Sequence, residues 1–149
     1  MKIEVSIQGV IPDKSSEQQI LVLKPISNDG GKFLPIWIGP AEAHSIKNAL
    51  KETRPEGRPL SHDLLKSMLT YFKVPLQKVV IYKMVQGTFF AHLYFNKRGT
   101  ELVVDSRPSD AISLAVRMNA PVFIEEEVYI KQNVSLSDKK RLEGINLEG

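Results

Sequence analysis

The feature that most constrains the fold of this chain is a segment that recurs along it at a fixed offset. Residues 34–43 read LPIWIGPAEA and residues 102–111 read LVVDSRPSDA, so a proline, an acid and an alanine return at the same relative positions. The correspondence continues beyond the segment, where Ile46 matches Leu114. Two copies are too few for a solenoid. We therefore expect a duplicated unit that folds into one pseudo-twofold domain.

Hydrophobic periodicity gives the elements of each copy. Alternating apolar and polar residues predict strands over residues 3–11, 19–25 and 33–38 in the first copy, and over 78–85, 88–96 and 100–104 in the second. Each third strand leads into a helix, over residues 40–51 and 108–119. A proline opens both helices, at a position where its missing N–H is no loss.

One more helix is predicted between the copies. It begins near Ser61, which can cap its N-terminus, and it ends at Val74-Pro75. Its apolar stripe is the clearest in the chain and consists of Leu64, Leu65, Met68, Leu69 and Phe72. A last strand is predicted over residues 122–129, and residues 137–143 are expected to form one or two frayed helical turns.

These elements predict an α+β fold. We expect a duplicated β-β-β-α unit whose antiparallel sheets pack against helices, with a barrel-like closure as one alternative and one extra helix between the copies. The predicted single domain covers residues 1–130, with pseudo-repeats over about 1–52 and 76–130 and a connecting loop and helix over 53–75. Residues 131–149 form a polar C-terminal tail.

Composition excludes several kinds of site. The chain has no cysteine, which rules out a disulfide scaffold, a thiolate zinc site and a cysteine nucleophile. Lys and Arg number 20 against 17 for Asp and Glu, a small surplus that permits nucleic-acid binding without demanding it. The first strand is not the apolar core of a signal peptide, and no apolar run could span a bilayer. We expect a cytoplasmic protein with no membrane partner.

Chemically capable side chains concentrate at the second strand-to-helix junction. Asp105, Ser106, Arg107, Ser109 and Asp110 stand there together. The two carboxylates could hold a divalent metal ion, and a guanidinium beside a helix N-terminus suits phosphate. A purely structural interpretation competes, because Ser106 could cap the helix, Asp110 could complement its dipole and Arg107 could pair with the acids.

A second cluster surrounds the start of the extra helix. His62 beside Asp63 could act as a general base or a metal ligand, and Arg58 in the preceding loop, with Arg54, could contact phosphate. Both kinds of residue are also ordinary on a protein surface. Along the strand over 88–96, Phe90, His92 and Tyr94 share one face, which could stack nucleobases but more often covers a core or a dimer contact.

Three segments together resemble the bifunctional nuclease domain family. They are LPIWIG at 34–39 with Glu42 and Ala43, Arg58-Pro59 with His62-Asp63-Leu64, and DSRPSDA at 105–111 with Leu114, Ala115 and Arg117. The likeness spans about residues 1–130, and SRPSDA is its most specific part. Because the sequence shows nothing plant-like and no targeting segment before the domain, we expect a bacterial member of the family.

The resemblance implies a nuclease that acts on DNA and RNA, as described for plant relatives, and a homo-oligomer, expected to be a dimer. It implies no assigned catalytic residues. From the residues themselves, we expect Asp105, Asp110 and His62 to be catalytic, the two aspartates holding a metal ion such as Mg²⁺. The expected substrate-binding residues are Arg107, Arg58 and Ser109. A non-catalytic module that binds phosphate ligands or nucleic acid, and a structural homodimer, remain alternatives.

Overall fold

Residues 1–27, 30–51 and 57–135 are described by the structure, a computed structural model. Within them the chain forms seven strands and four helices. In chain order these are β1 (Lys2–Pro12), β2 (Gln19–Pro25), β3 (Leu34–Ile38), α1 (Pro40–Leu50), α2 (Ser61–Tyr71), β4 (Leu76–Val85), β5 (Thr88–Lys97), β6 (Thr100–Ser106), α3 (Pro108–Met118), β7 (Val122–Glu125) and α4 (Glu126–Gln132).

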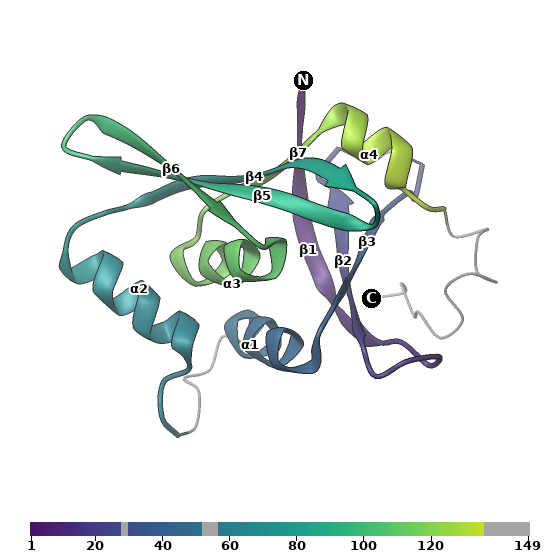
Figure 1. Ribbon diagram of the computed structural model, residues 1–149, viewed down its shortest axis with the longest axis horizontal. Helices are drawn as coiled ribbons and strands as arrows, with labels where there is room; N and C mark the ends of the chain where they lie inside the picture. Colours follow the sequence, from purple (N-terminus) through teal and green to yellow (C-terminus); the bar gives the residue numbers. More distant parts are fainter. Residues whose placement is uncertain (28–29, 52–56, 136–149) are drawn as a thin grey trace.

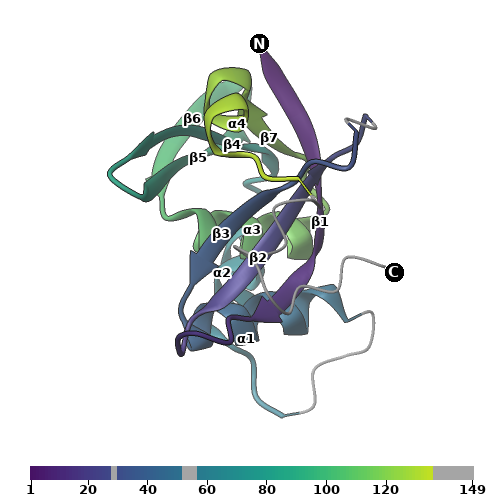
Figure 2. The same ribbon diagram turned by 90° about the vertical axis from the view of Figure 1, so that its right-hand side faces the viewer.

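All the strands belong to one sheet in the order β3-β2-β1-β7-β4-β5-β6. Neighbouring strands are antiparallel except β4 and β7, which are parallel. The sheet curls into a half-barrel, and α1 and α3 lie side by side against its inner face (Figures 1 and 2). The short strand β7 pairs with β1 on one side and β4 on the other, and it thereby joins two three-stranded meanders.

The α+β class predicted from the sequence is confirmed, but the expected antiparallel sheets are a single mixed sheet. Each meander is followed by a helix, so β1-β2-β3-α1 and β4-β5-β6-α3 have the same order of elements. The duplication itself and the domain boundaries stay predictions. Every helix in the described residues is too short or too polar to traverse a lipid bilayer. The cytoplasmic location also stays a prediction.

The prediction of one continuous strand over residues 122–129 is wrong beyond Glu125. Glu125 pairs with Lys2 at the very start of β1, so the ladder has no further partner on that side. The chain turns instead into α4, whose first turn carries Glu126 and Glu127, a favourable place for negative charge. The N–H of Glu126 donates to the carbonyl of Met1 at 2.8 Å. The helical turns expected over residues 137–143, and Arg54, lie outside the described residues.

The helix predicted after the proline-rich loop is confirmed as α2, but of its apolar stripe only Leu69 is among the described residues packed against the core. No residue of α2 is buried, and Leu64, Leu65, Met68 and Phe72 all remain substantially exposed. The N-cap is Leu60 rather than Ser61, and the N–H of Leu60 donates to the Asp63 carboxylate at 2.8 Å. Helix α2 is therefore held by contacts other than deep apolar burial.

The two junctions that lead into α1 and α3 share one backbone geometry. Gly39 has φ −73° and ψ 165°, and Arg107 has φ −68° and ψ 143°. Both are extended, as a residue before proline prefers to be, and neither helix has a side-chain cap. The junctions place Glu42 and Asp110 in the first turns of the two neighbouring helices.

The core lies between the sheet and the pair α1 and α3. Its fully buried members include Leu21, Ile46, Ile81, Ile112 and Ile124, which come from both meanders, both helices and β7. One cluster therefore spans most of the chain and fixes the two helices against the sheet.

We expect Ile112→Ala to lower the free energy of unfolding by about 2–5 kcal/mol, because it opens a cavity beneath α3. Ile130→Ala is the matched control, since Ile130 is 64% exposed and its loss should change stability by less than about 0.5 kcal/mol. Urea denaturation of both variants measures the difference. Equal effects would contradict the placement of α3 in the core.

Candidate functional site

A buried guanidinium connects three helices. Arg117 of α3 is 9% exposed. Its Nε donates to Asp63 of α2 at 2.8 Å. Its Nη1 donates to the carbonyl of Ser113 at 3.1 Å and to the hydroxyl of the same residue at 2.5 Å. Its Nη2 donates to the carbonyl of Ser45 in α1 at 3.2 Å and to the hydroxyl of that serine at 3.1 Å. Ser45 and Ser113 also hydrogen-bond to each other at 3.0 Å. Every nitrogen of this buried cation has a partner, as burial of a charge requires.

His62 continues the network toward the surface. Its Nδ1 lies 2.6 Å from the Ser45 hydroxyl, and its Nε2 lies 2.8 Å from Asp110 Oδ1. An ionised carboxylate only accepts hydrogen bonds, so the proton of a neutral ring is assigned to Nε2, and Nδ1 then accepts from the Ser45 hydroxyl. A serine, a histidine and an aspartate thus form one hydrogen-bonded chain across α1, α2 and α3.

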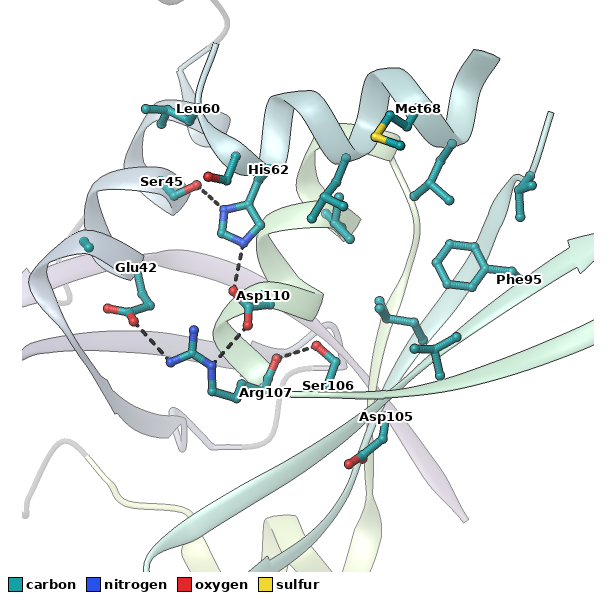
Figure 3. Close-up of a pocket in the computed structure, with 18 of the residues that line it drawn as sticks. Glu42, Ser45, Leu60, His62, Met68, Phe95, Asp105, Ser106, Arg107 and Asp110 are labelled. Atoms are coloured by element: carbon teal, nitrogen blue, oxygen red, sulfur yellow. Dashed lines mark hydrogen bonds and ion pairs between the residues drawn. The ribbon is translucent and has the colours of Figure 1, made fainter. Parts of the chain in front are cut away.

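Arg107 closes the network at the surface (Figure 3). Its Nε donates to Asp110 Oδ2 at 3.1 Å, and its Nη1 donates to Glu42 Oε1 at 3.2 Å. The Asp110 carboxylate, and then Glu42, raise the pKa of the guanidinium above its ordinary value. Two-thirds of the side chain is exposed, and its Nη2 makes no hydrogen bond within the described part of the chain. That N–H group can reach a ligand.

The network forms one end of a cavity of about 860 Å³ between the helices and the end of the sheet. Glu42, His62, Arg107 and Asp110 lie at this polar end, whereas the other end is apolar and includes Met68 and Phe95 (Figure 3). The volume is within the roughly 300–1,000 Å³ range of small-molecule sites. Charged, hydrogen-bonding groups at the end of an apolar hollow can orient a ligand and exclude water from it.

The structure brings three of the sequence-predicted residues together. His62 from α2, Asp110 from α3 and Arg107 before α3 are in direct contact through the carboxylate of Asp110. Ser106 does not cap α3, because its hydroxyl donates to the carbonyl of Arg107 at 2.9 Å. The segments at residues 62 and 107–110 therefore converge, as a shared site requires.

Asp105 is not part of this group. It is one of the residues that line the cavity, but its carboxylate accepts a hydrogen bond from the Tyr82 hydroxyl at 3.1 Å and lies 3.9 Å from His92 Nε2. Tyr82 and His92 stack on each other, with ring centroids 3.8 Å apart. Figure 3 shows the Asp105 side chain turned away from Asp110. The two carboxylates predicted to share a metal ion thus point in different directions.

Two predicted phosphate contacts also lie elsewhere. Arg58 is exposed and does not line the cavity. Ser109 is 6% exposed and borders a separate, smaller hollow with Trp37 and Phe89. Among the described residues, no group of three or more His, Asp or Glu side chains is arranged to hold a metal ion.

Sequence reasoning missed Glu42, Ser45, Ser113 and Arg117 as members of the site. A usable signal was present, because Ser45 and Ser113 stand 68 positions apart, the same offset as the repeated segments. Serines at equivalent positions on the buried faces of two helices need partners. Neither the serines nor Arg117 match a catalytic motif, so the pattern carried no obvious chemical meaning.

Comparisons with known proteins identify relatives of this chain. Residues 21–137 match the bifunctional nuclease domain. The chain is 32% identical over 136 residues to the uncharacterized protein Rv1829 of Mycobacterium tuberculosis, which covers 91% of this chain and 79% of that protein. It is 27% identical to Bifunctional nuclease 2 of Oryza sativa subsp. japonica and 28% identical to Bifunctional nuclease 2 of Arabidopsis thaliana. It spans only 42% and 41% of those two plant proteins.

We expect Asp63→Asn to lower the free energy of unfolding by about 1–3 kcal/mol near pH 7, because the Arg117 guanidinium loses its carboxylate partner. The hydrogen bond from Arg117 lowers the pKa of Asp63 from 3.8 in the folded protein. Its contribution is therefore present above pH 3.8 and is lost as the pH falls through the lowered folded-state pKa.

Urea unfolding near pH 7 and near pH 3 measures this effect. The difference between Asp63→Asn and the unmodified protein should shrink at the lower pH. Glu101→Gln on the exposed strand β6 is the control and should show no comparable pH-dependent difference. A penalty for Asp63→Asn that is the same at both pH values would contradict the prediction.

Proposed function

The chain belongs to the bifunctional nuclease domain family, and on that premise we propose that it hydrolyses phosphodiester bonds of DNA or RNA at the polar end of the cavity. One observation carries the proposal. His62 is held between Ser45 and Asp110, beside the exposed guanidinium of Arg107, where the cavity opens. Phosphodiester hydrolysis needs a group that moves protons and a cation that faces the phosphate, and this cluster has both.

In the proposal each residue has one role. Both ring nitrogens of His62 already have partners, so the proton of the attacking water goes to the partly exposed Asp110 carboxylate, and the Nε2 N–H of His62 orients that carboxylate. Arg107 contacts the phosphate through its unused Nη2 and offsets the charge that develops on it. Ser45 is a positioning residue, because its hydroxyl fixes the ring at Nδ1.

Of the two aspartates expected to bind a metal ion, the proposal keeps only one. Asp105 faces away from the cluster, so Asp110 is the predicted ligand that remains near the phosphate contact. Mg²⁺ commonly binds one or two carboxylates and completes its octahedron with water and substrate phosphate oxygens. A cation at Asp110 would take its other ligands in that way.

We expect Asp110→Asn to reduce cleavage by about 100-fold or more, since general acid–base catalysis contributes that much. His62→Asn should also reduce cleavage, because the Asp110 carboxylate loses the N–H group that orients it. The assay uses single-stranded and duplex DNA and RNA, with Mg²⁺, Mn²⁺ or EDTA. Ser45→Ala should cost less than His62→Asn. His92→Asn is the matched control, because His92 lies on the other side of β5 from the cavity and should leave cleavage unchanged.

The arms of this assay separate the alternatives. Cleavage that is lost both in EDTA and in the Asp105→Asn variant would support the metal site formed by Asp105 and Asp110. Cleavage that is lost in EDTA but kept in the Asp105→Asn variant would support a metal ion bound by Asp110 and substrate oxygens. Binding without cleavage would favour the non-catalytic binding module. Cleavage that survives in both His62→Asn and Asp110→Asn would contradict the assigned site.

We also propose that the protein is a homodimer joined through β6. This strand is the outer edge of the sheet, and Leu102, Val103 and Val104 are 40%, 49% and 46% exposed. A long apolar edge strand is normally paired or covered, because its free backbone groups attract other strands. Antiparallel pairing with β6 of a second copy would give an isologous interface and one continuous sheet.

We expect Val103→Lys to convert the dimer to a monomer, since a lysine on an edge strand blocks pairing. Val85→Lys is the control, because Val85 is 47% exposed but stands at the end of β4, away from the proposed interface. Sedimentation analysis gives the mass, and circular dichroism confirms that both variants fold. A monomeric parent protein at micromolar concentration would contradict the dimer.

A further inference from the structure

We propose that the apolar part of the cavity receives one unstacked nucleobase, so that the protein selects unpaired nucleotides. This inference rests on the proposed nuclease function and names the class of substrate that the site accepts. It comes from the contrast between the two ends of the cavity (Figure 3).

The apolar end is built from three parts of the chain. Its walls include Leu65 and Met68 of α2, Phe72 directly after that helix, Leu93 and Phe95 of β5, and Val104 of β6. In Figure 3, Glu42, His62, Arg107 and Asp110 gather at the opposite end, and the carboxylate of Asp105, also a lining residue, is bound to the Tyr82 hydroxyl. A wall of this composition cannot replace the water around a phosphate, because burying an unpaired charge is costly.

A nucleobase suits such a wall, whereas a sugar–phosphate backbone does not. The faces of a base are apolar and stack on aromatic side chains, and every base has such a face. Phe72, which is 61% exposed, supplies a ring, and Met68 supplies a sulfur that packs well against aromatic groups, whereas Phe95 is 6% exposed and contributes only to the wall. Within a duplex each base is already stacked and paired, so it must leave the helix before it can enter a pocket.

The two ends are spaced along one helix. His62 and Leu65 are three positions apart on α2, so they lie on the same face, and both line the cavity. A base beside Leu65 would therefore bring its adjoining phosphate toward His62 and Arg107. The cavity of about 860 Å³ is large enough for a nucleotide-sized ligand.

Single-stranded oligonucleotides that carry one abasic residue test this inference. In binding measurements by fluorescence anisotropy without divalent metal, and in cleavage mapping with it, the intact strand is compared with the abasic strand and with a duplex. We expect binding of a short abasic strand, and cleavage beside its abasic residue, to fall by about tenfold or more. Equal behaviour of intact and abasic strands would overturn the inference.

Two neighbouring substitutions on α2 sharpen the test. Leu65→Trp fills the apolar end, whereas Leu64→Trp adds the same side chain outside the cavity lining. Leu65→Trp should weaken binding of the intact strand to the level of the abasic strand, without weakening the abasic strand further. Leu64→Trp should leave both unchanged. Identical effects of the two variants, or none from Leu65→Trp, would count against a base pocket.

The outcomes distinguish this inference from the nuclease proposal. Cleavage of intact and abasic strands at equal rates would leave the nuclease standing and remove the base pocket. Binding that prefers the intact strand, without any cleavage, would keep the base pocket and remove the nuclease. If neither strand binds, the cavity does not receive a base and the inference is wrong. If Leu65→Trp dissociates a dimer that Leu64→Trp preserves, the apolar part of the cavity contacts a second copy of the chain, and the inference is also wrong.

Discussion

The bond between Arg117 and Asp63 determines where α2 lies, and the candidate site depends on that position. Helix α2 buries none of its residues, so apolar packing alone does not fix it. Its polar end is tied to α3 and α1 by the buried guanidinium and by His62. Removing one partner of a buried ion pair is costly, because the other charge remains desolvated. The same network therefore braces the helices and orients the histidine.

The polar cluster includes residues at matching positions of the two recurring segments, on α1 and on α3. Glu42 and Asp110 hold corresponding positions in the two recurring segments, and Arg107 bridges them. Ser45 and Ser113 correspond in the same way and share Arg117. His62 breaks this correspondence, because it comes from the connecting helix and contacts only one serine and one acid. The polar cluster therefore lies where α2 meets both α1 and α3.

Hydrophobic periodicity and turn residues were enough to predict the α+β class and most of the helices and strands, because the strands alternate clearly and proline opens both central helices, but they did not predict that β7 joins the strands into one mixed sheet. They failed at residues 126–129, where the missing strand partner, a tertiary property, decides the conformation. Only part of the candidate site could be predicted from the sequence. His62, Arg107 and Asp110 stand in conspicuous motifs, but whether Asp105 joins them depends on which face of β6 its side chain occupies. Ser45 and Arg117 acquire their roles only through contacts between helices.

The central place of β7 has a consequence for how the chain can fold during synthesis. This four-residue strand is the only connection between the two meanders in the described sheet, and it leaves the ribosome after both of them because it follows them in the sequence. Until it arrives, β1 and β4 present open edges. Contacts between distant parts of a sequence form slowly, and exposed edges invite wrong pairings. The two meanders can therefore join into one sheet only after β7 has been synthesised and has paired with both β1 and β4.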